Sequence, residues 1–121
     1  MMIGKKRFVQ QIDRKLSFEL WMETGSVYKA AKLLKDRHGL FNTRTGKNFS
    51  QMAVWDGAWK YIIENLVECR PLIADLWRAN GELLTEKIWY EMVCTKAKYV
   101  LSKKKYDEFI QSHLYLTPYQ K

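Results

Sequence analysis

Apolar residues recur at helical spacing along the start of the chain, and small or capping residues separate one run from the next. The first run predicts a helix over about residues 8–24, with an apolar stripe formed by Phe8, Ile12, Leu16 and Leu20. Gly25 can take the left-handed conformation that ends a helix, and Ser26 is a good N-cap for the next one. We therefore expect a second, shorter helix over residues 26–37.

The pattern changes between residues 40 and 50, where polar and basic residues interrupt the helical spacing. Two short stretches flank Arg44, Thr45 and Gly46, and Gly46 can adopt the positive φ of a tight turn, so we predict a small β-hairpin. Ser50 then N-caps a third helix over residues 51–66. Its predicted apolar face comprises Met52, Trp55, Trp59, Ile62, Ile63 and Leu66, which leaves an exposed arc of Ala53, Asp56, Gly57, Lys60 and Glu64.

Further helical runs follow and carry little net charge. Pro71 suits the first turn of a short helix, Thr85 caps the next helix, and Ser102 precedes the last one. The pattern as a whole predicts an all-α fold, a helix-turn-helix with a small β-hairpin in its turn and a C-terminal helical extension. We expect three parts: a helix-turn-helix region over residues 1–66, a helical extension over residues 67–118, and a loose tail over residues 119–121.

The positive charge is concentrated in the first part of the chain. Of the net charge of +8 on 121 residues, residues 1–50 contribute eleven Lys and Arg against four acids, whereas residues 51–121 contribute ten against nine. A basic excess on one segment is typical of a surface that binds nucleic acid, because such cations neutralise phosphates. The alternative is a basic domain whose lysines are simply solvated.

Other classes of function find little support in the sequence. No apolar run reaches the roughly 18 residues of a membrane span, and the basic start is not followed by the apolar stretch of a signal peptide. We therefore expect a cytoplasmic protein, associated with the nucleoid, or lying in the host cytoplasm if it is viral. Cys69 and Cys94 are 25 residues apart and have no second Cys or His at ligand spacing, so we expect two buried thiols, no metal and no cofactor.

Catalytic motifs are not recognisable either. His38 and His113 fit structural positions, and the chain has neither a Ser-His-Asp spacing nor a Gly-rich loop that cradles phosphates. The five Trp fall on apolar stripes, which favours core packing over stacking on unpaired bases. We therefore expect a non-enzymatic protein.

Two helices, a turn and a third helix form the plan of a helix-turn-helix, although the turn here is longer than usual. Residues 26–66 resemble the recombinase domain of large serine recombinases, through AKLL at residues 31–34, Gly39, TGKNFS at residues 45–50 and Val54. In that family the loop is a small hairpin and the segment binds DNA. The resemblance implies DNA binding alone, as in mobile-element and phage DNA-binding proteins, because nothing here resembles the family's catalytic serine domain or its zinc ribbon.

The first candidate DNA contacts lie between the second and third helices. Arg44 and Lys47, at the hairpin tip, can meet phosphates or a minor groove, and Asn48 can donate and accept hydrogen bonds at its edge. Ser50 and Gln51 stand at a helix N-terminus, where backbone N–H groups favour a phosphate, and Ser50 also suits a capping role.

Further candidates lie on the helices themselves. On the third helix, Ala53 is small enough to allow close approach to DNA, as is Gly57, while Asp56 and Lys60 could read bases. Ser26 and Lys29 open the second helix, where phosphate contacts are common in this plan. The basic surface could be extended by Lys5, Lys6, Arg7, Arg14 and Lys15. Six to eight phosphate contacts would give log K against log [salt] a slope of about 5 to 7.

The sequence thus predicts a protein that binds double-stranded DNA and acts as a regulator or accessory factor of a phage or mobile element. Residues 67–118 either complete the core or form a homodimer or higher oligomer. One alternative is a DNA-packaging or structural component of a phage-like element with an oligomerising tail. Another is a protein-interaction module without a nucleic-acid role, which predicts an exposed apolar patch on the helices after Pro71. Charge alone does not distinguish DNA from RNA.

Overall fold

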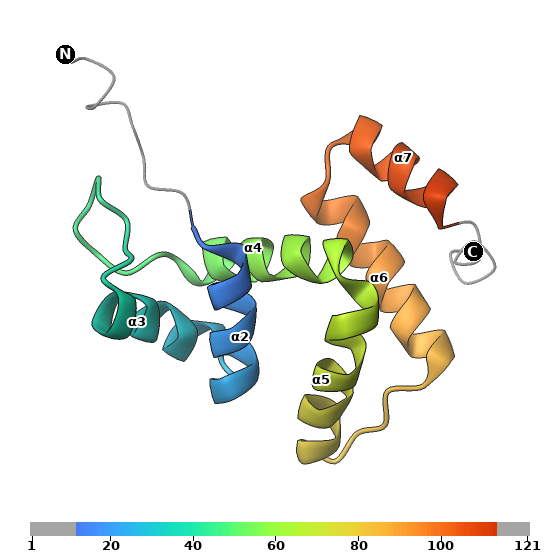
Figure 1. Ribbon diagram of the computed structural model, residues 1–121, viewed down its shortest axis with the longest axis horizontal. Coiled ribbons are helices and arrows are strands. Elements are labelled where there is room, and N and C mark those ends of the chain that lie inside the picture. The colour runs from blue at the N-terminus through green and yellow to red at the C-terminus, as the bar shows by residue number, and fades with distance from the viewer. Residues whose placement is uncertain (1–11, 114–121) are drawn as a thin grey trace. The chain divides into compact units, whose positions relative to one another are not determined.

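The computed structural model describes residues 12–113, and this part of the chain contains six helices and no β-strand (Figure 1). The helices are α2 (Arg14–Thr24), α3 (Val27–His38), α4 (Gln51–Glu64), α5 (Leu66–Ala79), α6 (Glu86–Val100) and α7 (Lys103–Ser112). The predicted all-α fold is confirmed for these residues. The predicted first helix over about residues 8–24 is wrong at its start: the helix begins at Arg14, where the Asp13 side chain accepts a hydrogen bond from the Leu16 N–H at 3.0 Å. The part of this prediction before residue 12 and the predicted tail over residues 119–121 lie outside the described residues.

The chain divides into two compact units, residues 1–58 and 59–121, and the division falls within α4. The functional boundary that we place at residue 66 stays a prediction. None of the described helices is both long enough and apolar enough to cross a membrane.

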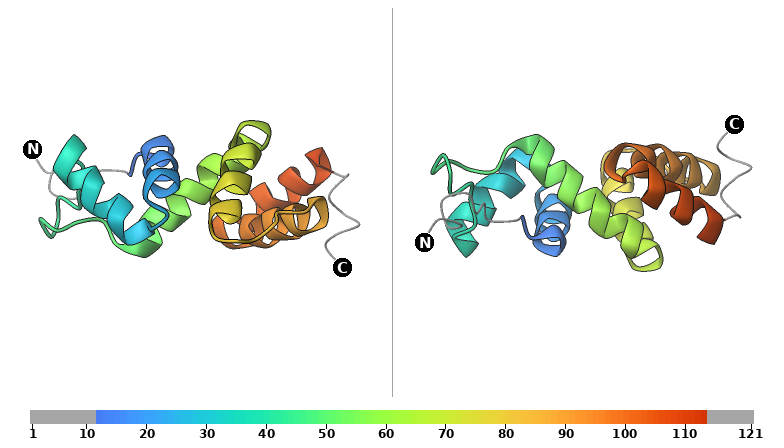
Figure 2. Two further views of the ribbon diagram at one scale, coloured as in Figure 1. Left: turned by 90° about the horizontal axis from the view of Figure 1, so that it is seen from below. Right: turned by 90° about the horizontal axis from the view of Figure 1, so that it is seen from above.

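The first unit has a core to which α2, α3 and the first half of α4 all contribute. Its buried residues are Leu20, Ala30, Ala31, Leu34, Phe49 and Val54. The helices α2 and α3 lie against each other (Figures 1 and 2). Because Ala30 and Ala31 carry only a methyl group, the backbone of α3 can come close to its neighbours.

Side-chain caps fix where the helices begin. The Ser26 hydroxyl accepts a hydrogen bond from the Lys29 N–H at 3.2 Å, and the Thr85 hydroxyl accepts one from the Ile88 N–H at 3.2 Å. The Ser102 hydroxyl does the same for the Lys105 N–H at 3.3 Å. Each cap satisfies a backbone donor that the first turn leaves without a partner, and all three predicted helix starts are confirmed.

The predicted β-hairpin between α3 and α4 is wrong. In this stretch the structure has one antiparallel bridge, between Asn42 and Lys47, in place of two strands. Leu40 and Phe49, which we expected on the strands, pack against the core of the first unit. Side chains of the turn bond to its own backbone, as described below, and such local bonds compete with a strand ladder.

The predicted faces of α4 also need correction. Met52, which we placed on the apolar face, is 69% exposed. Gly57, which we placed on the exposed arc, is buried, and a Cβ atom there would lie 3.0 Å from Cγ2 of Ile12. Ala53 packs partly buried against the core. Ala53 and Gly57 therefore belong to the side of α4 that packs in the first unit, and the missing side chain of Gly57 permits the close approach of Ile12.

The second unit contains α5 and α6, which lie side by side, and α7, which packs on α6 (Figures 1 and 2). The sequence placed the start of α5 at Pro71, but the helix begins at Leu66 and Pro71 lies inside it. Asn65 is the reason, because its side-chain amide donates to the Tyr61 carbonyl at 2.9 Å and so ends α4. Pro71 lacks the N–H that would bond to the Val67 carbonyl. Val67 lies in the exposed first turn of α5, where water can bond to this carbonyl instead.

The two cysteines lie in the second unit as buried thiols outside any disulfide, as predicted. Burial raises the pKa of the Cys69 thiol to about 12, with a smaller contribution from the negative charge of Glu68. Burial also raises the pKa of the Cys94 thiol. Neither group has the lowered pKa of a reactive cysteine.

Candidate nucleic-acid interface

The loop between α3 and α4 is closed on itself and tied to α3. The Asn42 N–H donates to the Lys47 carbonyl at 2.9 Å, and the Gly46 N–H donates to the Asn42 carbonyl at 2.8 Å. From the last turn of α3, the Lys35 ammonium donates to the Gly46 carbonyl at 3.0 Å and stands 5.3 Å above the centre of the Phe41 ring. These contacts hold residues 42–47 in one conformation beside α3.

The loop presents its two cations to solvent. The Asn42 side chain accepts a hydrogen bond from the Arg44 N–H at 3.0 Å, and the Thr45 hydroxyl accepts one from the Lys47 N–H at 3.2 Å. These bonds involve only the backbone of Arg44 and Lys47, and both residues are exposed. Gly46 has a φ of 73°, which the turn requires and which glycine adopts without strain.

Helix α3 adds three exposed lysines to the loop cations. These lysines, Lys29, Lys32 and Lys35, are spaced three residues apart. Three residues of an α-helix turn through about 300°, which is about 60° short of a full circle, so the three lysines form a band on one side of the helix. We call Lys29, Lys32, Lys35, Arg44 and Lys47 together the basic surface. Between residues 27 and 50, Asp36 is the only acidic residue.

Four members of the basic surface keep their charge uncompensated. Among the described residues, no carboxylate forms an ion pair with Lys29, Lys32, Arg44 or Lys47. Other cations of the first unit differ: Arg37 bonds to Glu23 at 2.9 Å, and Lys15 lies 4.0 Å from Glu19. The hydrogen bond from Arg37 lowers the pKa of the Glu23 carboxyl.

The predicted serines have defined local roles. Ser26 caps α3, as described above, and Ser50 caps α4 by accepting a hydrogen bond from the Ala53 N–H at 3.1 Å. Each hydroxyl still carries a proton that it can donate. Asn48 and Gln51, on either side of Phe49 and Ser50, are exposed, and the first turn of α4 contains no acidic residue.

The predicted readout residues of α4 are not gathered on one exposed arc. Ala53 and Asp56 are half-buried in the first unit, and Asp56 takes part in an interaction within the protein. Lys60 is also half-buried and belongs to the second unit. Of the cations that could extend the surface, Lys5, Lys6 and Arg7 lie outside the described residues, while Arg14 and Lys15 are exposed on α2.

Sequence reasoning missed three residues. Lys32 and Lys35 were not singled out, although their spacing with Lys29 on one helix is a signal that the sequence contains. The contact of Lys35 with Gly46 and Phe41 depends on how the loop folds back, and no spacing rule predicts it. Met52 is exposed in the first turn of α4, beside Gln51, where the sequence suggested a core position.

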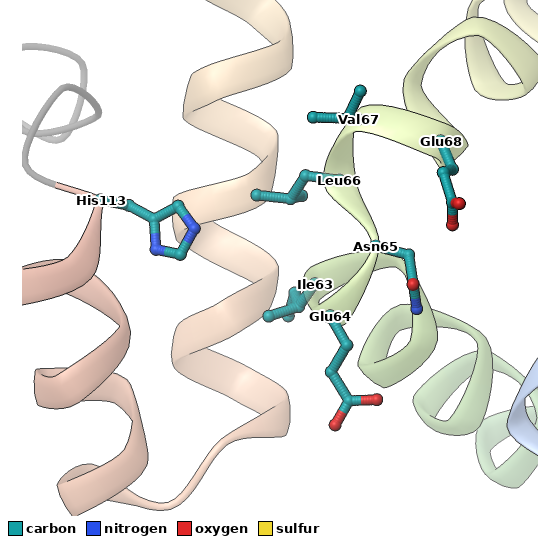
Figure 3. A pocket seen from close by; sticks show the side chains of 7 residues that line it. All are labelled: Ile63, Glu64, Asn65, Leu66, Val67, Glu68 and His113. Atoms are coloured by element: carbon teal, nitrogen blue, oxygen red, sulfur yellow. The ribbon is translucent and has the colours of Figure 1, made fainter.

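A hollow in the second unit holds ionisable groups as well. It has a volume of about 520 Å³, and Figure 3 shows it lined by Ile63, Glu64, Asn65, Leu66, Val67, Glu68 and His113. The Nδ1 atom of His113 lies 2.8 Å from the Phe109 carbonyl oxygen, and the rings of His113 and Phe109 stack with their centres 4.3 Å apart. These contacts fit the structural role expected for His113. Residues 12–113 contain no group of three side chains that could hold a metal ion.

Comparison of the chain with protein families, with curated proteins and with solved structures finds no match. The resemblance of residues 26–66 to the recombinase domain therefore stays a prediction.

Proposed function

We propose that this protein binds double-stranded DNA without catalysing a reaction, and that the basic surface of the first unit makes the main contacts. The observation that carries the proposal is the group of four exposed cations, Lys29, Lys32, Arg44 and Lys47, none paired with a described carboxylate. Solvated lysines on an ordinary surface are commonly interspersed with acids, whereas Asp36 is the only acid in this stretch.

The fixed conformation of the loop supports the same proposal. Residues 42–47 are closed by backbone bonds and tied to α3 through Lys35, so Arg44 and Lys47 keep their place relative to the lysines of α3. A preorganised set of cations loses less conformational entropy on binding than the same cations on a flexible tail. The spacing of phosphates along a duplex is regular, and a rigid band of cations suits such a polymer.

Helix α4 contributes its start to the proposed interface. Gln51 and Met52 are exposed in its first turn, where the backbone N–H groups and the helix dipole favour a phosphate. The proposed contacts are thus the basic surface together with Asn48, Ser50 and Gln51, with Ser26 at the start of α3. Asp56 and Lys60 are left out of the proposed contacts, because both are half-buried and Lys60 belongs to the second unit.

In a cell, such a protein would act as a regulator or accessory factor on DNA of a phage or mobile element, which is the context that the resemblance suggests. The proposal is tested by measuring affinity for a random-sequence duplex at several salt concentrations. Four phosphate contacts at about 0.9 each contribute about 3.6 to the slope of log K against log [salt]. Affinity that does not change with salt would refute the proposal, and equal salt-dependent affinity for duplex RNA would refute its restriction to DNA.

A further inference from the structure

The second unit contains an apolar groove between α5 and α6 that the proposed DNA contacts do not use. It encloses about 460 Å³ and is lined by Leu66, Val67, Arg70, Pro71, Ala74, Leu84, Trp89 and Tyr90. Seven of these eight residues are apolar or aromatic, and Arg70 is the only one that carries a charge. A groove of this size and composition is typical of a site that receives apolar side chains.

Arg70 is unusual among the arginines of this helix. It is half-buried, its guanidinium lies 5.9 Å from the centre of the Tyr90 ring, and no described carboxylate forms an ion pair with it. Arg78, in the last turn of the same helix, is exposed, and its guanidinium bonds to the Asp75 carboxylate at 2.8 Å. The Tyr90 hydroxyl donates a hydrogen bond to the Glu86 carboxylate at 3.3 Å. The Glu86 carboxylate therefore lies at the hydroxyl end of the Tyr90 ring. The planar N–H fork of Arg70 can therefore donate hydrogen bonds to the carboxylate of another molecule.

The edge of the groove is apolar and open to water. Val67 is 88% exposed, and in Figure 3 its side chain and that of Leu66 point away from Glu68. A small molecule in the groove would cover only the part of Val67 that lines it, whereas a protein segment laid along α5 would also cover the rest of this exposed side chain. The combination of an exposed apolar edge and an unpaired guanidinium favours a partner protein over a small ligand.

We propose that this groove receives an amphipathic helix of a partner protein, which inserts a large apolar side chain and places a carboxylate on Arg70. For both groups to reach the groove from one helix, the acid must stand three or four residues from the apolar side chain, because these positions share a face. The proposal does not depend on DNA binding, since its residues all belong to the second unit.

The test is the selection of random 16-residue peptides on the immobilised full-length protein, followed by affinity measurements with the peptides that are enriched. We expect an Asp or Glu three or four residues from a large apolar residue in these peptides. The Arg70→Ala substitution should weaken the affinity for these peptides by at least about tenfold, which is the size of effect expected for an arginine at the centre of an interface. The Arg70→Lys substitution should keep part of the affinity that Arg70→Ala loses. The matched control Arg78→Ala removes an arginine of the same helix and should change affinity less than about twofold.

A second variant keeps the test decisive if Arg70→Ala fails to fold. Val67→Asp alters a side chain that is 88% exposed, so the fold should tolerate it, while a charge at the groove edge should abolish binding of the peptides. Peptides without an acid, or peptides that bind the Arg70 and Val67 variants as tightly as the native chain, would overturn the proposal. A dimer in sedimentation experiments that Arg70→Ala dissociates would assign the groove to a second copy of this chain and would equally overturn it.

Discussion

Lys35 belongs to the basic surface, but the structure assigns it a different role from its neighbours. Its ammonium bonds to the Gly46 carbonyl and lies over the Phe41 ring, so it braces the loop. Replacing it by methionine keeps most of the aliphatic side chain and removes both interactions. A hydrogen bond and a cation–π contact at exposed sites are each worth about 0.5 to 1 kcal/mol. We therefore expect Lys35→Met to make opening of the loop easier by about 1 to 2 kcal/mol.

This change is measurable without any ligand. The amide hydrogens of Asn42 and Gly46 are bonded within the loop, and they exchange with solvent when the loop opens. A difference of about 1 to 2 kcal/mol corresponds to roughly 5- to 30-fold faster exchange at these two amides. Lys32→Met is the matched control, because Lys32 lies one turn earlier on the same helix and bonds to no loop residue. Hydrogen exchange followed by NMR should show the acceleration in the Lys35 variant alone.

The two variants should also differ in DNA binding. Lys32→Met should reduce the slope of log K against log [salt] by about 0.9, because it removes a proposed phosphate contact. Lys35→Met should reduce affinity through loop opening, with a smaller change in slope. Unchanged exchange at Asn42 and Gly46 in Lys35→Met would refute the bracing role, whatever the DNA measurements show.

Three further outcomes follow from packing and ionisation. Gly57→Leu should lower the free energy of unfolding by about 1 to 3 kcal/mol in a thermal melt, because the first atom of the side chain already meets Ile12 at 3.0 Å; an unchanged melt would contradict the packing. Arg37 lowers the pKa of Glu23, so the stability that Glu23 contributes is present above pH 4.5 and is lost as the pH falls through the lowered pKa. The free energies of unfolding of Glu23→Gln and of the native chain should therefore converge in acid. A difference between them that stays constant with pH would refute this. With its pKa raised to about 12, Cys69 should react with iodoacetamide at pH 8 only after denaturant is added, and rapid labelling of the folded chain would show that the thiol is accessible.

Local signals in the sequence were enough to predict most helix starts. Ser26, Thr85 and Ser102 each cap a helix, because an N-cap is a contact between residues three apart and needs no knowledge of the rest of the fold. The apolar spacing predicted the all-α fold for the same reason. The prediction for the start of α5 is wrong because the bond from the Asn65 side chain to the Tyr61 carbonyl ends α4, whereas the sequence marks a helix start only at Pro71.

Contacts between distant residues account for the remaining errors. The burial of Gly57 follows from the approach of Ile12, 45 positions earlier, and no periodicity rule contains that contact. The apolar pattern predicts Met52 on the buried face of α4 and Gly57 on its exposed arc, but Met52 is exposed and Gly57 is buried. Size and hydrophobicity alone therefore do not define the buried side of this helix. In the candidate interface, Arg44 and Lys47 were foreseen from charge and turn chemistry, whereas the loop that holds them depends on Lys35 and Phe41.

The central claim is that the loop cations contact DNA phosphates, and one measurement tests it most directly. The affinity for a random-sequence duplex is measured across salt concentrations for the native chain and for Arg44→Ala/Lys47→Ala. A matched control, Lys104→Ala/Lys105→Ala, removes the same net charge from exposed residues of the second unit. We predict that the loop variant alone reduces the slope of log K against log [salt] by about 1.8. No binding by the folded native chain at low salt, or equal slopes for the two variants, would contradict the account.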